Sequence, residues 1–485
     1  MTNEDLMEKK MLCYLCIGDD YLKREVELKG ALGMCSCCGE ELEGYTFEKL
    51  ADIVERVFET HFYRTADQPY SWQLTLRADK ESDYEWEREG TPVVTLIADL
   101  LDISEEFAKV IQSILEERHS DFDSAAMGEE TEFSDESYYE ERHIDDRAWQ
   151  REWFGFESSL KNENRFFNSS AEHVLSNIFN GIFKIQASSG KSVIVDAGPD
   201  TEFNTVCRAR VCQSDEEIKL VISYPDREIG PPPSRIATAG RMNAQGISVF
   251  YGAQNVDTAI AEVRPPVGSQ VVVAFFEIIR PLKLLNLDAF SSVVEKGSVF
   301  DPLFAGRLEK AAFLSTLCKR FARPVMPNEQ SFEYLPTQCV ADFLACANNP
   351  ALDGIMFPSA QKPNSGMNIV LFHKSARVEE RIVPAGATIE ASTYTQYDDG
   401  YEREYSVIER LPNLQKSKKE RDASQVSPWL SDYPEKQRGG DTREVSLRIV
   451  LESICVQVIK SVSVTTEEYP VSRFEYEKNE SHMDF

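Results

Sequence analysis

The sequence lacks the features that would carry it into or across a membrane. None of its apolar runs approaches the ~20 residues that span a bilayer. The first five residues, Met1 to Asp5, are partly acidic and lack the basic and apolar regions of a secretion signal. We therefore expect a cytoplasmic protein with no membrane partner, in which cysteine thiols stay reduced.

Positive charge and histidine are also scarce. Lys and Arg number 52 against 82 Asp and Glu, which gives a formal net charge of −30. Because binding to nucleic acid needs clustered cations, this balance argues against a nucleic-acid partner. The six histidines are scattered, so they do not suggest a histidine metal site. The sequence has no Walker loop and no G-x-G-x-x-G motif, which argues against a Rossmann mode of dinucleotide binding.

Apolar residues, in contrast, are plentiful. The chain has 485 residues, of which 42% are hydrophobic. This is enough for two or three domains with sizeable cores, and it argues against wholesale disorder. The sequence shows no internal repeat and leaves the oligomeric state open, with a homo-oligomer among the alternatives.

Five of the eleven cysteines lie in the N-terminal 45 residues. Cys13-x2-Cys16 is followed 18 residues later by Cys35-x2-Cys38, a spacing typical of tetrahedral Zn²⁺ sites. Four thiolates leave no open coordination position, so the ion would be structural. Two alternatives remain open. Cys37 could replace a member of the second pair, or the cysteines are free buried thiols.

The next part of the chain has a helical pattern. Apolar residues recur at helical spacing after three Ser or Thr start signals, and each run predicts an amphipathic helix with its apolar face in a core. The start signals are Thr46, Ser104, and Ser169 or Ser170. An acidic run, Asp121–Asp146, interrupts these helices with eleven carboxylates and one arginine. We interpret it as a solvated linker, with an acidic docking surface as the alternative.

Short strands and helices then alternate, which predicts a mixed α+β domain. The expected strands are Ser192–Val195, Ser248–Tyr251, Val271–Ile278 and Asn368–Phe372, and the expected helices are Thr258–Val263, Leu308–Phe321 and Thr337–Ala347. The run Val271–Phe276 is continuously apolar, as in a strand covered on both faces. Further on, Asn413–Asp441 is typical of a loop or linker, and Val445–Val464 suggests strands.

These patterns divide the chain into four parts. They are a four-cysteine zinc knuckle at 1–45, a helical domain at 46–190 with the acidic linker near 121–146, the α+β domain at 191–378, and an extension of unknown role at 379–485.

The stretch Gly240–Arg264 gathers residue types that carry chemistry. Arg241 lies on a glycine-flanked loop before a strand that ends in Tyr251, and Asp257 can cap the short helix that follows. Glu262 then lies in an apolar part of that helix. A carboxylate in such a place is either salt-bridged or functional, and the residues alone leave both alternatives open.

This stretch resembles the RES domain, a family named for its Arg, Glu and Ser. The matching residues are Arg241, Glu262 and Ser359. Further similarities to the family are an opening arginine motif at Cys207–Arg210, a helix-starting Tyr motif at Tyr334–Gln338 and a closing strand at Asn368–Phe372. The cysteine knuckles together with Arg165–Asn168 resemble the HEPN/RES N-terminal domain found fused to RES domains.

The resemblance implies an ADP-ribosyltransferase-like α+β fold after a zinc-knuckle and helical N-terminal domain. It implies an NAD⁺ glycohydrolase or phosphorylase, a bacterial toxin that depletes NAD⁺ by cleaving the nicotinamide–ribose bond. It also implies restraint by an inhibitory antitoxin or regulatory protein, or by the N-terminal domain. Two alternatives stay open, namely a protein ADP-ribosyltransferase that uses the same site and a non-enzymatic acidic interaction protein that contains zinc.

Cleavage of this bond builds oxocarbenium character on the ribose. A carboxylate beside that carbon stabilises the transition state more than the neutral ribose, which is the role we expect for Glu262. Arg241 and Tyr251 complete the expected catalytic group, because an arginine can hold a pyrophosphate or an incoming phosphate and a tyrosine can stack on the nicotinamide or ribose.

Arg208, Tyr334 and Ser359 are expected to bind NAD⁺. A structural alternative stays open for five residues of the two groups. Arg241 could be a loop arginine, Glu262 an ion-paired glutamate and Ser359 a turn hydroxyl, and the other two, Tyr251 and Tyr334, could be packed aromatic rings. For Arg210, pairing with structural carboxylates and ligand binding are equally supported by the sequence.

Overall fold

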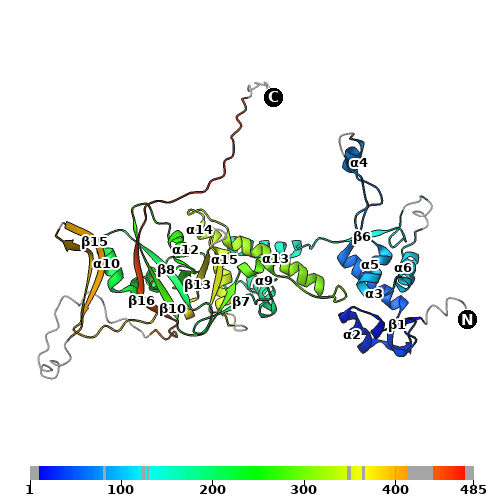
Figure 1. The fold of residues 1–485 in the computed structure, drawn as a ribbon, viewed down its shortest axis with the longest axis horizontal. Helices are drawn as coiled ribbons and strands as arrows, with labels where there is room; N and C mark the ends of the chain where they lie inside the picture. The colour runs from blue at the N-terminus through cyan, green and yellow to red at the C-terminus, as the bar shows by residue number, and fades with distance from the viewer. Residues whose placement is uncertain are drawn as a thin grey trace, which may run out of the picture. The chain divides into compact units, whose positions relative to one another are not determined.

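The structure is a computed structural model that describes residues 10–79, 83–121, 127, 130–346, 351–362, 366–398, 400–412 and 441–475 (Figure 1). The chain forms two compact units, and each is described by itself. Unit 1 comprises Met1–Val195, Gly240–Ala244 and Leu284–Phe357, and unit 2 comprises Asp196–Ala239, Gln245–Lys283 and Pro358–Phe485. The combination of helices and sheets confirms the expected α+β class.

Unit 1 begins with a small antiparallel sheet that holds the cysteine pairs. Its strands follow the order β1 (Met11–Cys13), β3 (Glu41–Thr46), β2 (Ala31–Met34). Helix α2 (Asp20–Lys29) lies between the two pairs in sequence. Its N-cap is Asp19, whose side chain accepts a hydrogen bond from the Leu22 backbone at 2.8 Å. Such a cap satisfies one of the free N–H groups at a helix start.

Three helices build the core that follows, α3 (Phe47–His61), α5 (Val93–Leu101) and α6 (Glu105–Arg118). The helices predicted from Thr46 and Ser104 are confirmed, and both residues stand at the N-cap. The Thr46 hydroxyl accepts from the Lys49 backbone, whereas the Ser104 side chain makes no cap bond.

The interpretation of the acidic run as a solvated linker is wrong for residues 130–141. Tyr138–Glu141 forms strand β6, which pairs with β4 (Phe62–Arg64) and β5 (Thr91–Pro92). Phe133 and Tyr139 are buried and pack on Phe58, with ring centroids 5.2 and 4.7 Å away. Residues 122–126 and 128–129 of the run lie outside the described residues.

An ion pair removes much of the cost of packing this acidic segment. Both carboxylate oxygens of Glu130 accept from Arg88 at 2.7 Å, a fork geometry that suits arginine. The stabilisation from the buried aromatic rings and from this ion pair exceeds the repulsion between the carboxylates. A count of charged residues in the sequence does not reveal either contribution.

The remaining elements of unit 1 are helical apart from one parallel pair of strands. The helices are α4 (Ser71–Ala78), α8 (Arg147–Asn162), α9 (Ser169–Phe179), α13 (Phe304–Ala322), α14 (Gln330–Glu333) and α15 (Leu335–Cys346). The predicted cap of α9 at Ser169 or Ser170 is wrong, because Asn168 accepts from the Ala171 backbone at 2.9 Å. Strands β11 (Leu282–Asn286) and β12 (Gly354–Pro358) pair in parallel.

Unit 2 contains five antiparallel strands that carry most of the expected chemistry. Their order is β16 (Leu447–Val458), β10 (Gln270–Ile278), β8 (Thr205–Cys212), β9 (Phe250–Ala253), β13 (Met367–Leu371). Val271 to Ala274 of β10 are all fully buried, which confirms the strand predicted from this apolar run. The other predicted strands are found within two residues, and that from 192–195 is β7 (Ile194–Ala197).

The helices of unit 2 are short. They are α10 (Asp215–Ser223), α11 (Pro225–Glu228) and α12 (Val256–Glu262). Helix α12 packs Ala259 against Cys207, Val271 and Val273 in one apolar cluster, so its position is set by β8 and β10. Strands β14 (Thr388–Tyr397) and β15 (Gly400–Arg410) form a separate two-stranded ribbon.

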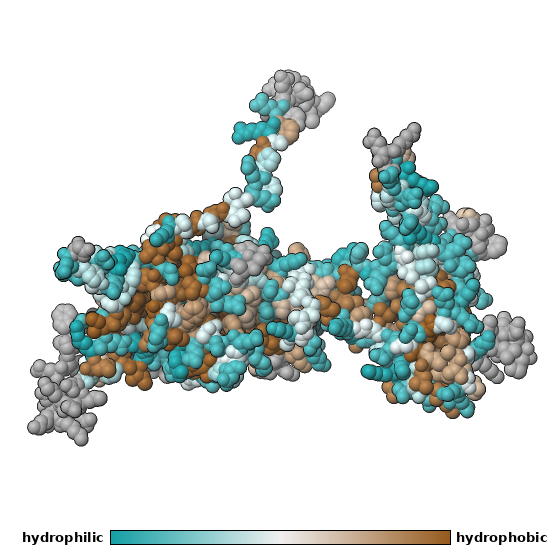
Figure 2. All heavy atoms as spheres, in the orientation of Figure 1, coloured by the Kyte–Doolittle hydropathy of each residue, from teal (hydrophilic) through white to brown (hydrophobic). Residues whose placement is uncertain are grey.

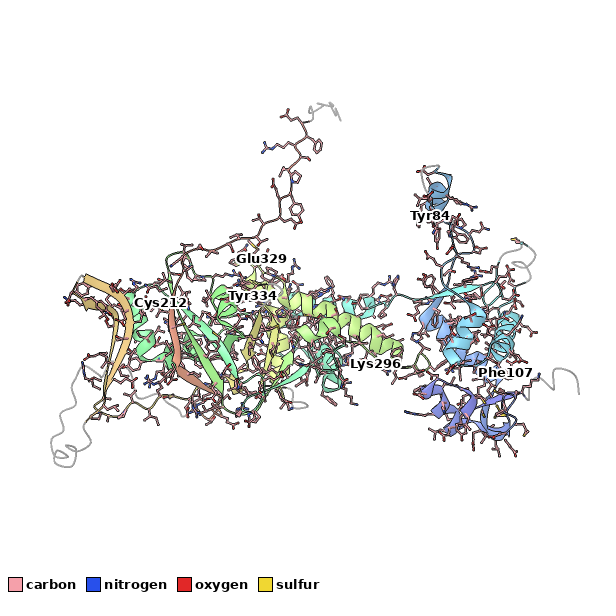
Figure 3. All side chains as sticks on the ribbon, in the orientation of Figure 1. Tyr84, Phe107, Cys212, Lys296, Glu329 and Tyr334 are labelled. Atoms are coloured by element: carbon pink, nitrogen blue, oxygen red, sulfur yellow. The ribbon has the colours of Figure 1, made fainter. Side chains whose placement is uncertain are left out.

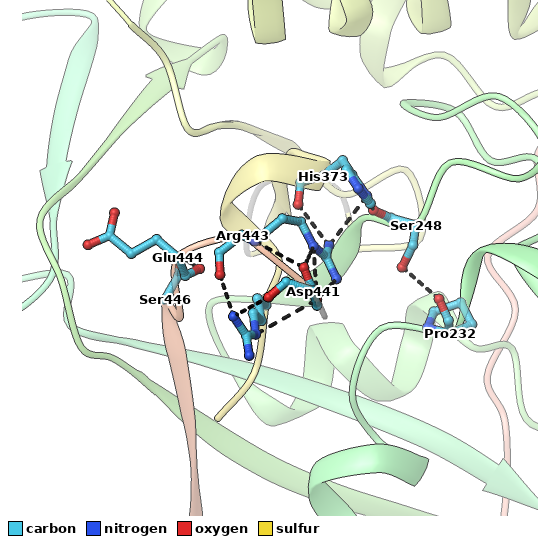
Figure 4. Close-up of polar contacts among 8 residues, drawn as sticks. Pro232, Ser248, His373, Asp441, Arg443, Glu444 and Ser446 are labelled. Carbon is cyan, nitrogen blue, oxygen red and sulfur yellow. Dashed lines mark hydrogen bonds and ion pairs between the residues drawn. The ribbon is translucent and has the colours of Figure 1, made fainter. Parts of the chain in front are cut away.

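The C-terminal strand β16 is an integral part of unit 2. It pairs with β10 from Gln270↔Val458 to Ile278↔Leu447. Hydrogen bonds hold the segment just before β16 in place, as Figure 4 shows. Arg443 donates to Asp441 at 2.7 Å and to the carbonyl of His373 at 2.9 Å. Strands were expected within 445–464, and one strand, β16, is found there. Residues 413–440 of the predicted loop lie outside the described residues.

Apolar atoms are visible on the surface over β16, among a largely hydrophilic exterior (Figure 2). Leu451 and Val458 contribute to this exposed apolar surface. In the part of the chain that the structure describes, no helix is both long enough and apolar enough to cross a membrane.

Candidate functional site

Helix α12 presents Glu262 at its last residue. The predicted cap at Asp257 is wrong, because Asn255 accepts both the Thr258 N–H at 2.9 Å and the Thr258 hydroxyl at 2.8 Å. Asn255 is extended, as an N-cap residue must be, whereas Asp257 already lies in the first turn. Its carboxylate is exposed and lies 3.7 Å from Lys362.

One oxygen of the Glu262 carboxylate is held by two uncharged donors. Oε1 accepts from the Ser359 hydroxyl at 2.5 Å and from Asn368 Nδ2 at 2.8 Å. Within the described ranges, Glu262 has no cationic partner and Oε2 accepts no hydrogen bond. The side chain is exposed, so this second oxygen is open to a ligand. The described residues therefore give no support to the alternative that Glu262 is a salt-bridge partner.

The Ser359 hydroxyl is fully occupied. It accepts from the backbone N–H groups of Gln361 at 3.1 Å and Lys362 at 3.2 Å while it donates to Glu262. A hydroxyl has one hydrogen and two acceptor positions, so nothing is left over for a second ligand. In this arrangement Ser359, which is buried, orients the carboxylate.

Asn368 is the residue of this cluster that the sequence did not single out by itself. It is buried near the start of β13, opposite Ala253 of β9. The one available signal was a carboxamide placed directly before the apolar run Ile369–Leu371. A buried amide needs hydrogen-bond partners, and Glu262 supplies one of them.

A hollow of about 400 Å³ lies at the N-terminal end of α12. Asn255, Thr258, Phe275 and Lys362 are among the residues that line it. Lys362 also belongs to the turn that fixes Ser359. The hollow is within the size range of ligand pockets, about 300–1,000 Å³.

Arg208 carries a buried donor that lacks an acceptor. Its Nη1 is inaccessible to solvent and has no hydrogen-bond partner among the described residues. Its guanidinium carbon lies 5.1 Å from the centre of the Phe250 ring. Burial and, to a smaller extent, the charge of Arg210 lower the pKa of Arg208 to about 10, although Tyr251 acts in the opposite direction. A buried donor without a partner destabilises the folded state. An acceptor atom of a bound ligand would remove this cost.

Arg210, two residues along the same strand, is already paired. Its Nη1 donates to Glu228 Oε2 at 2.7 Å and to the Glu228 carbonyl at 2.6 Å, and its Nη2 lies 3.4 Å from Glu217. Of the two alternatives, the structure supports pairing with structural carboxylates.

Arg241 and Tyr334 lie together in unit 1. The guanidinium donates to the carbonyls of Phe321 and Arg323, both at 2.8 Å, so it caps the C-terminal end of α13. The ring of Tyr334, labelled in Figure 3, lies 5.0 Å from its central carbon. The Arg241 carbonyl accepts from Thr337 at 2.6 Å, which ties the loop to the start of α15.

The predicted site residues thus fall into three groups. Glu262 with Ser359, and Arg208 beside Tyr251, belong to unit 2, whereas Arg241 with Tyr334 belongs to unit 1.

The four predicted zinc ligands form one cluster. The sulfur atoms of Cys13, Cys16, Cys35 and Cys38 all lie within 4.8 Å of one another. Cys37 is not in this group and is exposed, so the second pair is Cys35 and Cys38. Four thiols at this separation fit a tetrahedral ion with sulfur ligands.

The backbone around Cys35 favours its thiolate form. Burial raises the pKa of this thiol, but N–H groups of Cys38, Cys13 and Cys37 lower it more, to about 6. Two of these contacts are hydrogen bonds of 3.3 Å from Cys13 and 3.4 Å from Cys37. Gly39 then closes the knuckle with a φ of 74°, a conformation that glycine adopts without strain.

The family model of the RES domain matches residues 212–394. This range includes Arg241, Tyr251, Glu262, Tyr334 and Ser359, and it begins just after Arg208. No curated protein is similar enough to match the chain.

Proposed function

We propose that this chain, with its RES domain at residues 212–394, cleaves the nicotinamide–ribose bond of NAD⁺ and transfers the ADP-ribosyl group to water or phosphate. The observation that carries the proposal is the Glu262 carboxylate, oriented through one oxygen by Ser359 and Asn368 and otherwise open. A carboxylate held by neutral donors keeps its full charge for a ligand.

The bond breaks between the ribose carbon and the pyridinium nitrogen. Nicotinamide leaves as a neutral molecule with the bonding electron pair, so the leaving group needs no proton. Positive charge develops on the ribose, and the negative charge of Glu262 stabilises it. Water or phosphate then bonds to that carbon, and an attacking water releases its proton to solvent or to Glu262.

Arg208 supplies an anion-binding donor in this proposal. Its buried Nη1, which has no hydrogen-bond partner within the described ranges, could donate to an acceptor oxygen such as those of the NAD⁺ pyrophosphate. Bonds between arginine and phosphate are among the strongest of their kind. Tyr251, which interacts electrostatically with Arg208, would place its ring against the nicotinamide or ribose.

Arg241 and Tyr334 are expected to bind NAD⁺ on the family resemblance alone. The two carbonyl bonds of Arg241 use two of its five N–H donors, so donors remain for an anion. The bonds also fix the guanidinium, which limits the entropy lost when it binds a ligand.

The N-terminal cluster would hold a structural Zn²⁺ through Cys13, Cys16, Cys35 and Cys38. When bound, the ion supplies folding energy by joining two loops that are far apart in sequence. The chemistry of NAD⁺ does not involve it. Because NAD⁺ loss harms the cell that makes the enzyme, the proposal also implies an inhibitory antitoxin or another regulatory protein.

The test is incubation of the purified full chain with NAD⁺ labelled in the adenosine part. We expect release of nicotinamide together with free ADP-ribose in water, or ADP-ribose 1″-phosphate in phosphate buffer. Label attached to a polypeptide would replace this acceptor assignment with protein ADP-ribosylation. Absence of nicotinamide release would contradict the proposal.

A further inference from the structure

Helix α4 exposes three large apolar side chains. Trp72, Leu74 and Leu76 are 58, 50 and 40% exposed, and the preceding Tyr70 is 61% exposed. The one buried residue of the helix is polar: Gln73 is 6% exposed, and its side chain accepts from the Tyr70 backbone at 2.8 Å. This is the reverse of a surface helix, which buries its apolar face and exposes its polar one.

The spacing of these residues gives the helix two apolar faces. Trp72 and Leu76 are four residues apart and share one side, and Leu74 lies on the opposite side. Exposed polar residues, Ser71, Thr75 and Arg77, lie between these apolar side chains, and a helix of eight residues has little stability without tertiary contacts. Among the described residues, these three side chains stay 58, 50 and 40% exposed, which leaves an apolar surface that another molecule can cover.

Acidic residues flank the helix. In the chain that follows α4, Asp83, Glu85, Glu87 and Glu89 are exposed and alternate with half-buried residues. Tyr84, labelled in Figure 3, is one of the latter. Arg88, the one cation of this stretch, is bound to Glu130. The row of carboxylates therefore keeps its negative charge.

We propose that the α4 arm, residues 66–79 and 83–90, docks into a partner protein whose groove has an apolar floor and a rim of Lys and Arg. Insertion of an apolar helix into a groove is a common mode of recognition, and the carboxylate row selects a basic rim. A second copy of this chain fits poorly, because its net charge of −30 brings like charges together.

The test uses a labelled amphipathic helical peptide made only of Leu and Lys, which presents the same chemistry as the groove. Its binding to the purified full chain is measured by fluorescence anisotropy. We expect binding that weakens with added salt and that falls at least about tenfold in a Trp72→Gln/Leu76→Gln double variant.

The matched control is Leu303→Gln, which changes an exposed leucine outside the arm and is expected to bind the peptide like the unaltered chain. Circular dichroism confirms that both variants fold. Equal binding by the double variant would overturn the proposal, as would equal binding of a peptide made of Leu and Glu. Self-association that is lost in the double variant would also overturn it, in favour of a second copy.

Discussion

The cysteine cluster and the Glu262 cluster are both built from polar groups in close contact, but they differ in what they leave open. Four sulfur atoms face one another within 4.8 Å, so every ligand position of a tetrahedral ion is filled. Glu262 has one oxygen held and the other open. A closed cluster stabilises a fold, and a half-open one is suited to chemistry. The predictions below test this division of roles.

The largest effect is expected at the closed cluster. Replacement of Cys13 and Cys16 by Ser removes two thiolates, so the chain should lose its zinc and the free energy of unfolding of the N-terminal part should fall by more than about 4 kcal/mol. Metal analysis and thermal unfolding measure both. Cys37→Ser, which changes the exposed thiol outside the cluster, should retain metal and stability. Unchanged stability of metal-free protein would refute a folding role.

Arg208→Lys tests the buried anion donor of unit 2. Lysine keeps the charge but loses the planar fork, so NAD⁺ should bind about tenfold more weakly, as expected for one charged hydrogen bond. Isothermal titration measures the affinity. Arg210→Lys is the matched control, because Arg210 is already paired with Glu228, and its NAD⁺ affinity should not change. Equal affinities in both variants would remove Arg208 from the site.

Asn368→Leu tests whether the second donor to Glu262 matters. Leucine has a similar shape but cannot donate, so kcat should fall about fivefold, the equivalent of one hydrogen bond of about 1 kcal/mol, with little change in KM. Ser248→Ala is the control, since it removes another buried hydrogen bond of unit 2, to Pro232. If both variants lose stability but keep kcat, Asn368 is only structural.

The smallest effect is expected for Arg241→Lys. Lysine lacks the planar fork that donates to the carbonyls of Phe321 and Arg323, so we expect a melting temperature lower by a few degrees, which corresponds to about 1 kcal/mol. We expect NAD⁺ binding to weaken only about threefold. A loss of binding larger than that of Arg208→Lys would make Arg241 the main anion ligand.

Features encoded by neighbouring residues could be predicted from the sequence. The cysteine spacing identifies four thiols that the structure brings together, and the apolar periodicities place α3, α6 and β10 correctly. In each case a short stretch contains the whole signal. The RES motifs identify Glu262 and Ser359, which lie 2.5 Å apart although 97 positions separate them in sequence.

Features that depend on distant partners could not be predicted. The acidic run packs because Phe133 and Tyr139 enter a core and Glu130 finds Arg88, 42 residues away. The caps at Asn168 and Asn255 were missed because several neighbouring polar residues could serve, and backbone geometry selects one. Likewise, no local signal shows that Gly240–Ala244 belongs to the unit that contains the N-terminal residues.

The most direct test of the half-open carboxylate is Glu262→Gln, assayed for nicotinamide release, NAD⁺ binding and thermal unfolding. Glutamine preserves the shape and removes the charge. We predict that turnover falls at least about 100-fold, or about 2.7 kcal/mol, while NAD⁺ affinity and melting temperature change little, because the ground-state ribose carries no positive charge. A stable Glu262→Gln protein that releases nicotinamide at a near-normal rate would contradict the account.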